Sequence, residues 1–183
     1  MECDMDLPAF RYHPDPIKSG SIVSSPAQCL CCKAQRGFIY AGPVYSEADL
    51  EESLCPWCIA DGSAHRAFDA SFANPAGFPD GIAPDVIDEI AYRTPGFAAW
   101  QEEKWLTCCN DAAAFVEPIG YAELRARYPQ LEGTLMMYIV HELEISGGAA
   151  NRFLRALDRD GGPTAYVFAC RHCDSQPAYI DYL

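Results

Sequence analysis

Apolar residues recur every three or four positions along several stretches of the chain, and this spacing predicts amphipathic helices. The clearest covers residues 148–159, where Ala150, Phe153, Leu154 and Leu157 fall on one face. The apolar run 135–143 predicts a buried helix, with a strand as the alternative. Further helices are predicted over 47–53, 64–72, 97–106 and 121–128, and another begins at Pro84 and includes Ile90.

Short runs rich in aromatic and β-branched residues predict strands at 37–40, 164–169 and 178–182. The last two would pair as a hairpin. The expected fold class is therefore α+β, with small β-hairpins packed with several α-helices.

Proline, serine and glycine mark the irregular segments. The first 28 residues are rich in Pro, Ser and Asp and are expected to run extended over the surface. Residues 74–85 are rich in Pro and Gly and predict a loop. This loop is the best candidate for a boundary between an N-terminal segment with a cysteine-rich module, residues 1–73, and a helical region with the C-terminal hairpin, residues 74–183. The two parts could also pack as one domain.

Four of the ten cysteines form two C-x-x-C pairs, Cys29 with Cys32 and Cys55 with Cys58. A tight turn of this spacing can aim both sulfurs at one ion, and its amides can donate to the thiolates. The 22 residues between the pairs slightly exceed the usual separation of about 15–20 in four-cysteine zinc sites. We therefore predict one closed, structural Zn²⁺ site here, which would make the hairpins of zinc-ribbon or knuckle type.

The second pair permits a different interpretation, because Cys55-Pro56-Trp57-Cys58 is similar to the dithiol of thioredoxin-like oxidoreductases. Such a dithiol should follow a strand and open a helix, whereas the preceding segment predicts a helix. A redox dithiol and a set of ordinary buried cysteines remain the alternatives to zinc.

A third pair, Cys170 and Cys173, lies at the turn of the C-terminal hairpin and could hold a second Zn²⁺. Its partners would come from Cys108 and Cys109. Adjacent cysteines rarely bind one ion together because neighbouring side chains diverge, so only one of the two is expected to bind. Water, His172 or Asp111 would complete the shell, and an open position could be catalytic. No role is assigned to Cys3, Cys31 or Cys108.

The formal net charge is −13, from 26 acidic and 13 basic residues. This charge argues against nucleic-acid binding, which needs clustered Lys and Arg, and it suits a basic partner. The acidic run 47–52 could be part of such a surface. The N-terminus lacks the pattern of a secretory signal, and no apolar run approaches the ~20 residues of a membrane helix. A cytoplasmic location without membrane association is expected, where paired cysteines more often hold metal than form disulfides.

Several long motifs resemble the CbrC family, bacterial proteins associated with tolerance to a DNase-type colicin. They run from residue 7 to the C-terminus: Leu7-Pro8-x-Phe10-x-Tyr12-His13-Pro14-x-Pro16, Tyr40-x-Gly42-Pro43-Val44-Tyr45, Cys55-Pro56-Trp57-Cys58 through Ala64, Arg93-Thr94-Pro95-Gly96-Phe97, and Asp160-Gly161 through Cys173. The resemblance implies zinc ligands at the cysteine pairs. It also implies a histidine where this chain has Cys108 and a later cysteine where it has Ala113. Cys109, Cys170 and Cys173 therefore remain as ligands of the second site, and the fourth is missing or replaced by Cys108.

These features together predict a zinc-binding protein, not an enzyme, that confers tolerance or immunity to a basic toxin by binding it through an acidic surface. The alternative is an enzyme: a hydrolase with zinc at the incomplete second site, or a thiol oxidoreductase using Cys55 and Cys58.

Overall fold

The computed structural model describes residues 7–101 and 103–182, so Cys3 lies outside the described residues. The chain forms two compact units, residues 1–98 and residues 99–183. This division falls downstream of the 74–85 loop suggested by the sequence. Small antiparallel hairpins and short helices make up both units, which confirms the α+β class. No helix in the described parts of the chain is long and apolar enough to cross a membrane.

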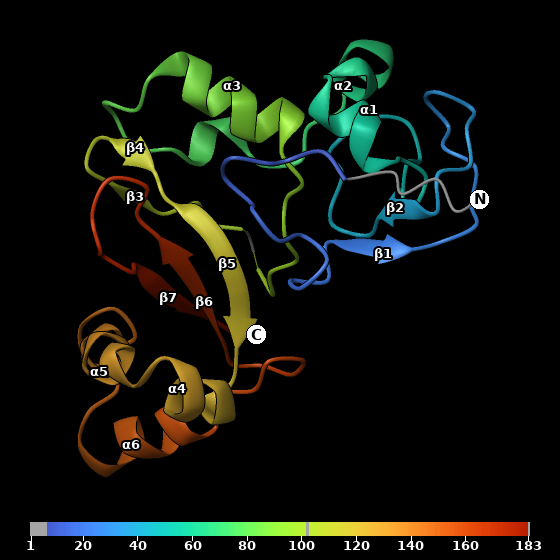
Figure 1. Ribbon diagram of the computed structural model, residues 1–183. Coiled ribbons are helices and arrows are strands. Elements are labelled where there is room, and N and C mark those ends of the chain that lie inside the picture. The colour runs from blue at the N-terminus through green and yellow to red at the C-terminus, as the bar shows by residue number, and fades with distance from the viewer. Residues whose placement is uncertain (1–6, 102, 183) are drawn as a thin grey trace. The chain divides into compact units, whose positions relative to one another are not determined.

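The first unit combines one small hairpin with short helices (Figure 1). Strands β1 and β2 pair antiparallel, with Ile22 opposite Tyr40. The elements of this unit are β1 (Ile22–Ser24), β2 (Phe38–Tyr40), α1 (Pro56–Ala60), α2 (Ser63–Phe68), a 3-10 helix (Pro75–Gly77) and α3 (Pro84–Arg93). The core of the unit is built by β2, the segment before α1, α1 itself and the segment after α2, through buried Ile39, Leu54, Ile59 and Phe72.

Gly96 is required by close packing within this unit. A Cβ atom there would lie 2.0 Å from the carbonyl oxygen of Phe72 and 3.0 Å from the hydroxyl of Tyr40. Because a backbone carbonyl cannot move aside alone, we expect Gly96→Ala to destabilise the protein by about 3 kcal/mol or more. Gly77→Ala is the matched control, since its Cβ would meet nothing within 4 Å. Urea unfolding of the two variants measures the difference, and equal midpoints would contradict the predicted clash.

His13 is fully buried, so we expect the stability of the protein to fall in acid. Its Nδ1 lies 2.7 Å from the carbonyl of Pro95, which can only accept, so Nδ1 carries the proton; its Nε2 lies 2.7 Å from Ser19 Oγ. Burial lowers the pKa of His13 from 6.5 to about 4, despite the bond to Pro95. As the pH falls, His13 is therefore protonated in the unfolded state before it is protonated in the folded state. Roughly 3 kcal/mol of stability should be lost as the pH falls from 6.5 to 4.

Comparing wild type with His13→Asn isolates this contribution, because zinc loss at low pH would act on both proteins. The difference in free energy of unfolding between them should shrink from pH 7.5 to pH 4. If the free energies of unfolding of the two proteins instead ran parallel across this pH range, the burial of His13 would not lower its pKa.

The second unit is built on a three-stranded antiparallel sheet in the order β5-β6-β7 (Figure 1). A separate short hairpin, β3 with β4, precedes the sheet. The elements are β3 (Thr107–Cys108), β4 (Asp111–Ala112), β5 (Ala114–Ile119), α4 (Tyr121–Arg127), a 3-10 helix (Pro129–Leu131), α5 (Glu132–His141), α6 (Gly147–Arg155), β6 (Thr164–Ala169) and β7 (Ala178–Asp181). One core packs the three helices against the sheet, with Leu124, Leu135, Leu154 and Val167 among its buried residues.

Most of the predicted elements are present, with shifted ends. The strands at 37–40, 164–169 and 178–182 correspond to β2, β6 and β7, and the helices at 64–72, 121–128 and 148–159 to α2, α4 and α6. The run 135–143 is confirmed as helical by α5, and its strand alternative is wrong. The sequence did not predict β1, α1, β3, β4 or β5.

The helix predicted over 47–53 is absent. The backbone carbonyls at its end serve other partners, since Ser53 accepts from the amide of Leu30 and Leu54 accepts from the amide of Tyr40. Glu52 also takes a left-handed backbone, with φ of 47°. The left-handed backbone of Glu52 is incompatible with a continuing helix, and the capping pattern at Ser46 closes only a local turn, in which its hydroxyl accepts from the amide of Ala48.

The described part of the predicted helix 97–106 contains no helix either. The amides of Trp100 and Gln101 both donate to the carboxylate of Asp181, at 2.8 and 2.9 Å. Further along, Leu106 accepts from the amide of Ala113. The carboxylate of Asp181 therefore takes the two amides that a helix would have paired locally, and Trp105 is buried from an irregular segment.

Candidate metal centres

Two cysteine-bearing turns meet in the first unit and form the first centre, which consists of Cys29, Cys32, Cys55 and Cys58. Cys29 and Cys32 flank a turn between β1 and β2, closed by the bond from the Lys33 amide to the Cys29 carbonyl. Cys55 caps the N-terminus of α1 and Cys58 lies in its first turn, with Pro56 starting the helix. The short helix thus carries the second pair of sulfurs to the turn that carries the first.

The four sulfurs of the first centre are spaced as a tetrahedral metal site requires. The Sγ atoms of Cys29 and Cys58 lie 3.8 Å apart, as do those of Cys32 and Cys55. Four thiolates about 2.3 Å from a zinc ion would lie ~3.8 Å from one another, whereas a disulfide bond measures about 2.05 Å. All four cysteines are free thiols. The spacing fits a shared ion and does not fit disulfides.

Backbone amides around the first centre stabilise the thiolate form of Cys29. The amide of Cys55 donates to the Sγ atom of Cys29 at 3.3 Å. Burial by itself raises the pKa of the Cys29 thiol, but amides of Cys32, Cys55 and Cys31 outweigh it and lower the pKa to about 7. Burial raises the pKa of Cys55 to about 11 and that of Cys58 still further. Without a cation, the buried set therefore resists full ionisation, and a bound metal ion would supply the missing positive charge.

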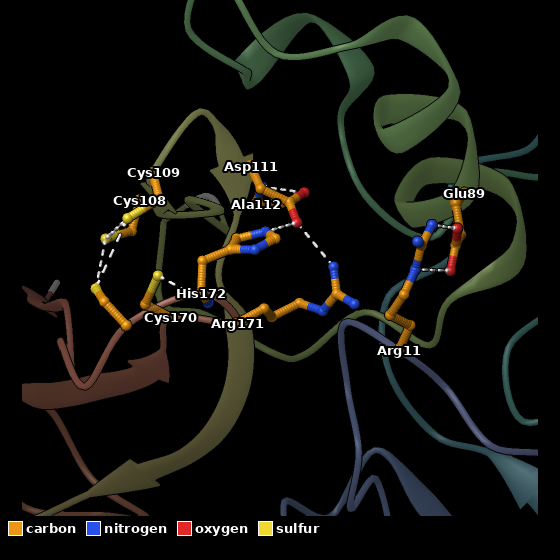
Figure 2. Close-up of polar contacts among 10 residues, drawn as sticks. Arg11, Glu89, Cys108, Cys109, Asp111, Ala112, Cys170, Arg171 and His172 are labelled. Atoms are coloured by element: carbon orange, nitrogen blue, oxygen red, sulfur yellow. Dashed lines mark hydrogen bonds and ion pairs between the residues drawn. The ribbon is translucent and has the colours of Figure 1, made fainter.

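The second centre joins the β3–β4 hairpin to the turn between β6 and β7 and consists of Cys108, Cys109, Cys170 and Cys173 (Figure 2). The Sγ atom of Cys173 lies 3.8 Å from that of Cys108 and 3.7 Å from that of Cys109. Cys108 and Cys109 are themselves 3.8 Å apart at sulfur. These separations again match the edges of a four-thiolate tetrahedron, at ~3.8 Å.

Both adjacent cysteines reach this centre, although only one of them was expected to bind from their adjacency. The reason is the hairpin turn between β3 and β4, where Cys109 and Asn110 adopt left-handed φ angles of 54° and 59°. This backbone turns the Cys109 side chain toward the same side as that of Cys108. We expected water, His172 or Asp111 to complete the shell, but a fourth sulfur takes this position instead.

Asp111 and His172 form a polar group beside the second centre instead (Figure 2). The Oδ2 atom of Asp111 accepts from Arg171 Nη1 at 2.7 Å and lies 2.7 Å from His172 Nε2. Its Oδ1 atom accepts from the amide of Ala112 at 2.8 Å. The nearly buried carboxylate thus ties the β4 strand to the turn that carries Cys170 and Cys173.

The thiols of the second centre differ in acidity according to their partners. The amide of His172 donates to Cys170 Sγ and lowers the pKa of this thiol to about 6, against the effect of desolvation. Cys109 has a pKa raised to about 12, chiefly by its hydrogen bond with Cys173. The hydrogen bond with Cys170 raises the pKa of Cys108.

The two centres differ most in exposure. Three sulfur-bearing residues of the first centre are buried, and only Cys32 is exposed. In the second centre, Cys109 and Cys173 are exposed and the other two are half-buried. Cys31 belongs to neither centre; its thiol contacts Ser63 Oγ at 3.5 Å. Each centre could hold one metal ion, and four thiolates at tetrahedral spacing suit zinc.

Comparison with known proteins places the whole chain in one family. Residues 7–182 match the model described as "Uncharacterised protein family (UPF0167)". The chain is 44% identical over 177 residues to UPF0167 protein Mb2317 of Mycobacterium bovis and to UPF0167 protein MT2352 of Mycobacterium tuberculosis, covering 96% of this chain and 94% of each relative. It is 40% identical over 178 residues to UPF0167 protein PA1536 of Pseudomonas aeruginosa, covering 96% of this chain and 97% of that protein. No solved structure matches the chain. The protein therefore belongs to the UPF0167 family.

Proposed function

We propose that this protein is a binding protein whose two four-cysteine centres each hold a structural Zn²⁺, and that it protects a bacterial cell by binding a basic protein toxin. The observation that carries the first part is the number of sulfurs in each centre. Four thiolates complete a tetrahedral shell, so neither ion would keep an open position for water or substrate. Zinc would then supply folding energy and crosslink distant turns.

The same observation argues against the enzymatic alternatives. A zinc hydrolase needs a coordination position for water, and the expected gap at the second centre is filled by Cys108. A redox dithiol needs the sulfurs of Cys55 and Cys58 to react with a substrate disulfide, whereas here Cys55 lies 3.8 Å from Cys32, and Cys58 lies 3.8 Å from Cys29. The dithiol is better explained as half of a metal site.

The basic partner is supported by the charge distribution and by the resemblance to the CbrC family. Residues 1–98 contain 14 acidic residues against six basic ones. In the acidic run, Glu47, Asp49, Glu51 and Glu52 are all exposed, and none forms an ion pair with another described residue. Nuclease toxins carry basic surfaces that bind phosphate, and an acidic surface speeds association with such proteins. A DNase-type colicin is the partner that the resemblance suggests.

Two measurements test the two parts separately. Native mass spectrometry of the purified protein should give two zinc ions per chain, and a metal-free folded protein would overturn the structural role. Calorimetry with the nuclease domain of a DNase-type colicin should show binding, and co-expression should protect cells from that toxin. Absence of both binding and protection would overturn the toxin-binding function.

A matched pair of variants locates the binding surface. Replacing Glu51 and Glu52 by glutamine should slow association, most strongly at low salt, because exposed charges act mainly on the association rate. Replacing the exposed Asp80 and Asp88 by asparagine removes the same charge from the same unit. If both pairs slow association equally, net charge alone drives the encounter and the acidic run has no special role.

A further inference from the structure

The first unit contains a pocket of about 230 Å³ that neither metal centre uses. Three segments line it: residues 9–11 of the N-terminal segment, Ala60 at the end of α1, and the C-terminal part of α3 with Glu89 and Arg93, followed by Thr94. All of these residues belong to the 1–98 unit. The motifs at residues 7–16 and 93–97, which the metal centres leave unexplained, thus meet at one cavity.

One arginine of the pocket is fixed by an ion pair. Arg11 donates from Nε to Glu89 Oε1 at 3.1 Å, and its Nη2 contacts Glu89 Oε2, so the guanidinium meets the carboxylate in a two-pronged arrangement (Figure 2). Such pairs hold planar groups in a defined orientation. This pair joins the N-terminal segment to α3 and leaves no net charge of its own in the pocket.

The second arginine has no polar partner among the described residues. The guanidinium of Arg93 makes no hydrogen bond or ion pair with any residue in 7–101 or 103–182. Its side-chain stem passes the Gly62 backbone, where a Cβ atom would lie 3.5 Å from Arg93 Cγ and Cδ. The stem therefore has a packed neighbour, while the charged end has none in this part of the chain.

The positive charge of this pocket is unusual for its surroundings. Residues 1–98 contain six cationic residues against 14 acidic ones, yet two of the six line this cavity. Because Glu89 cancels Arg11, the wall carries the single positive charge of Arg93. A guanidinium of this kind in a concave wall matches the planar oxygens of a carboxylate or phosphate.

We propose that this pocket binds a small organic anion whose carboxylate or phosphate group pairs with Arg93. The Arg11–Glu89 pair would offer polar contacts on the opposite segment, and Ala9, Phe10 and Ala60 would meet the apolar part of the ligand. The volume lies below the ~300–1,000 Å³ of drug-sized sites, so the ligand is a small metabolite. This proposal is independent of toxin binding.

Titration of the zinc-loaded ¹⁵N-labelled protein, followed by NMR, tests the pocket. The probes are inorganic phosphate and butyrate, each against sodium chloride at equal ionic strength. We expect saturable shifts clustered at the amides of residues 9–11, 60, 93 and 94. Saturation by phosphate alone assigns a phosphoryl ligand, and saturation by butyrate alone assigns a carboxylate.

Arg93→Gln should lower the affinity for the probe that saturates by about tenfold or more, as expected for loss of a charge-assisted pair. Lys18→Gln removes the same charge outside the pocket and should leave the affinity unchanged. If Arg93→Gln proves poorly folded, Arg93→Lys keeps the charge without the forked donor and should bind with intermediate affinity. Non-saturating shifts with both probes, or equal losses of affinity in Arg93→Gln and Lys18→Gln, would overturn the proposal.

Discussion

Cys55→Ser is expected to remove one zinc ion per chain and to unfold the residue 1–98 unit. Structural zinc contributes about 10–16 kcal/mol to the folding of small zinc modules, which equals or exceeds the ~5–15 kcal/mol net stability of a typical domain. Cys55 is fully buried and connects α1 to the turn bearing Cys32, 3.8 Å away at sulfur. Its loss would leave three thiolates and an incomplete shell at the centre of the unit.

Zinc content by native mass spectrometry and the far-ultraviolet circular dichroism spectrum measure this outcome. Cys31→Ser is a stringent control, because Cys31 lies in the same turn as Cys32 but outside the cluster. The control should retain two zinc ions and wild-type stability. A Cys55→Ser protein with two zinc ions and an unchanged thermal midpoint would show that the four sulfurs do not form one site.

The ligands of the first centre could be predicted from the sequence because the information is local. Each C-x-x-C pair needs only one tight turn to aim two sulfurs together, and the separation of the pairs along the chain is only slightly longer than usual for one shared ion. What the sequence missed around this centre is tertiary. The segment 47–53 has a helical pattern, but Glu52 takes a left-handed backbone, and the carbonyls of Ser53 and Leu54 accept from Leu30 and Tyr40, which no local pattern predicts.

The fourth ligand of the second centre stayed open for a related reason. Adjacent cysteines diverge on an extended or helical backbone, so only one of the pair was expected to bind, and the family resemblance left the fourth position missing or replaced by Cys108. The β3–β4 hairpin and its left-handed turn at Cys109 and Asn110 change this geometry. An Asn after the cysteine pair was the available signal, because Asn is among the residues that tolerate a left-handed backbone.

The two centres are also expected to release zinc at different rates, because they differ in exposure. Zinc leaves a thiolate site through steps in which a competing ligand or a proton reaches a sulfur, and exposed sulfurs are reached first. Cys109 and Cys173 are exposed at the second centre, whereas Cys29, Cys55 and Cys58 are buried at the first. A chelator should therefore remove the second zinc ion at least about tenfold faster than the first, a difference of ~1.4 kcal/mol in activation free energy.

Zinc release into a chromogenic chelator, followed in time, should thus show two phases of equal amplitude. Cys173→Ser assigns them, because it should remove the fast phase alone while the residue 1–98 unit keeps its zinc. The hairpin β3–β4 should loosen in this variant, since Cys108 and Cys109 would lose the ion that ties them to the β6–β7 turn. Asp111 would still hold Arg171 and His172, so we expect the sheet β5-β6-β7, whose core of aliphatic residues lies against α4, α5 and α6, to stay folded. Loss of the slow phase in Cys173→Ser would instead mean that the buried centre exchanges faster, and exposure would not govern zinc release in this protein.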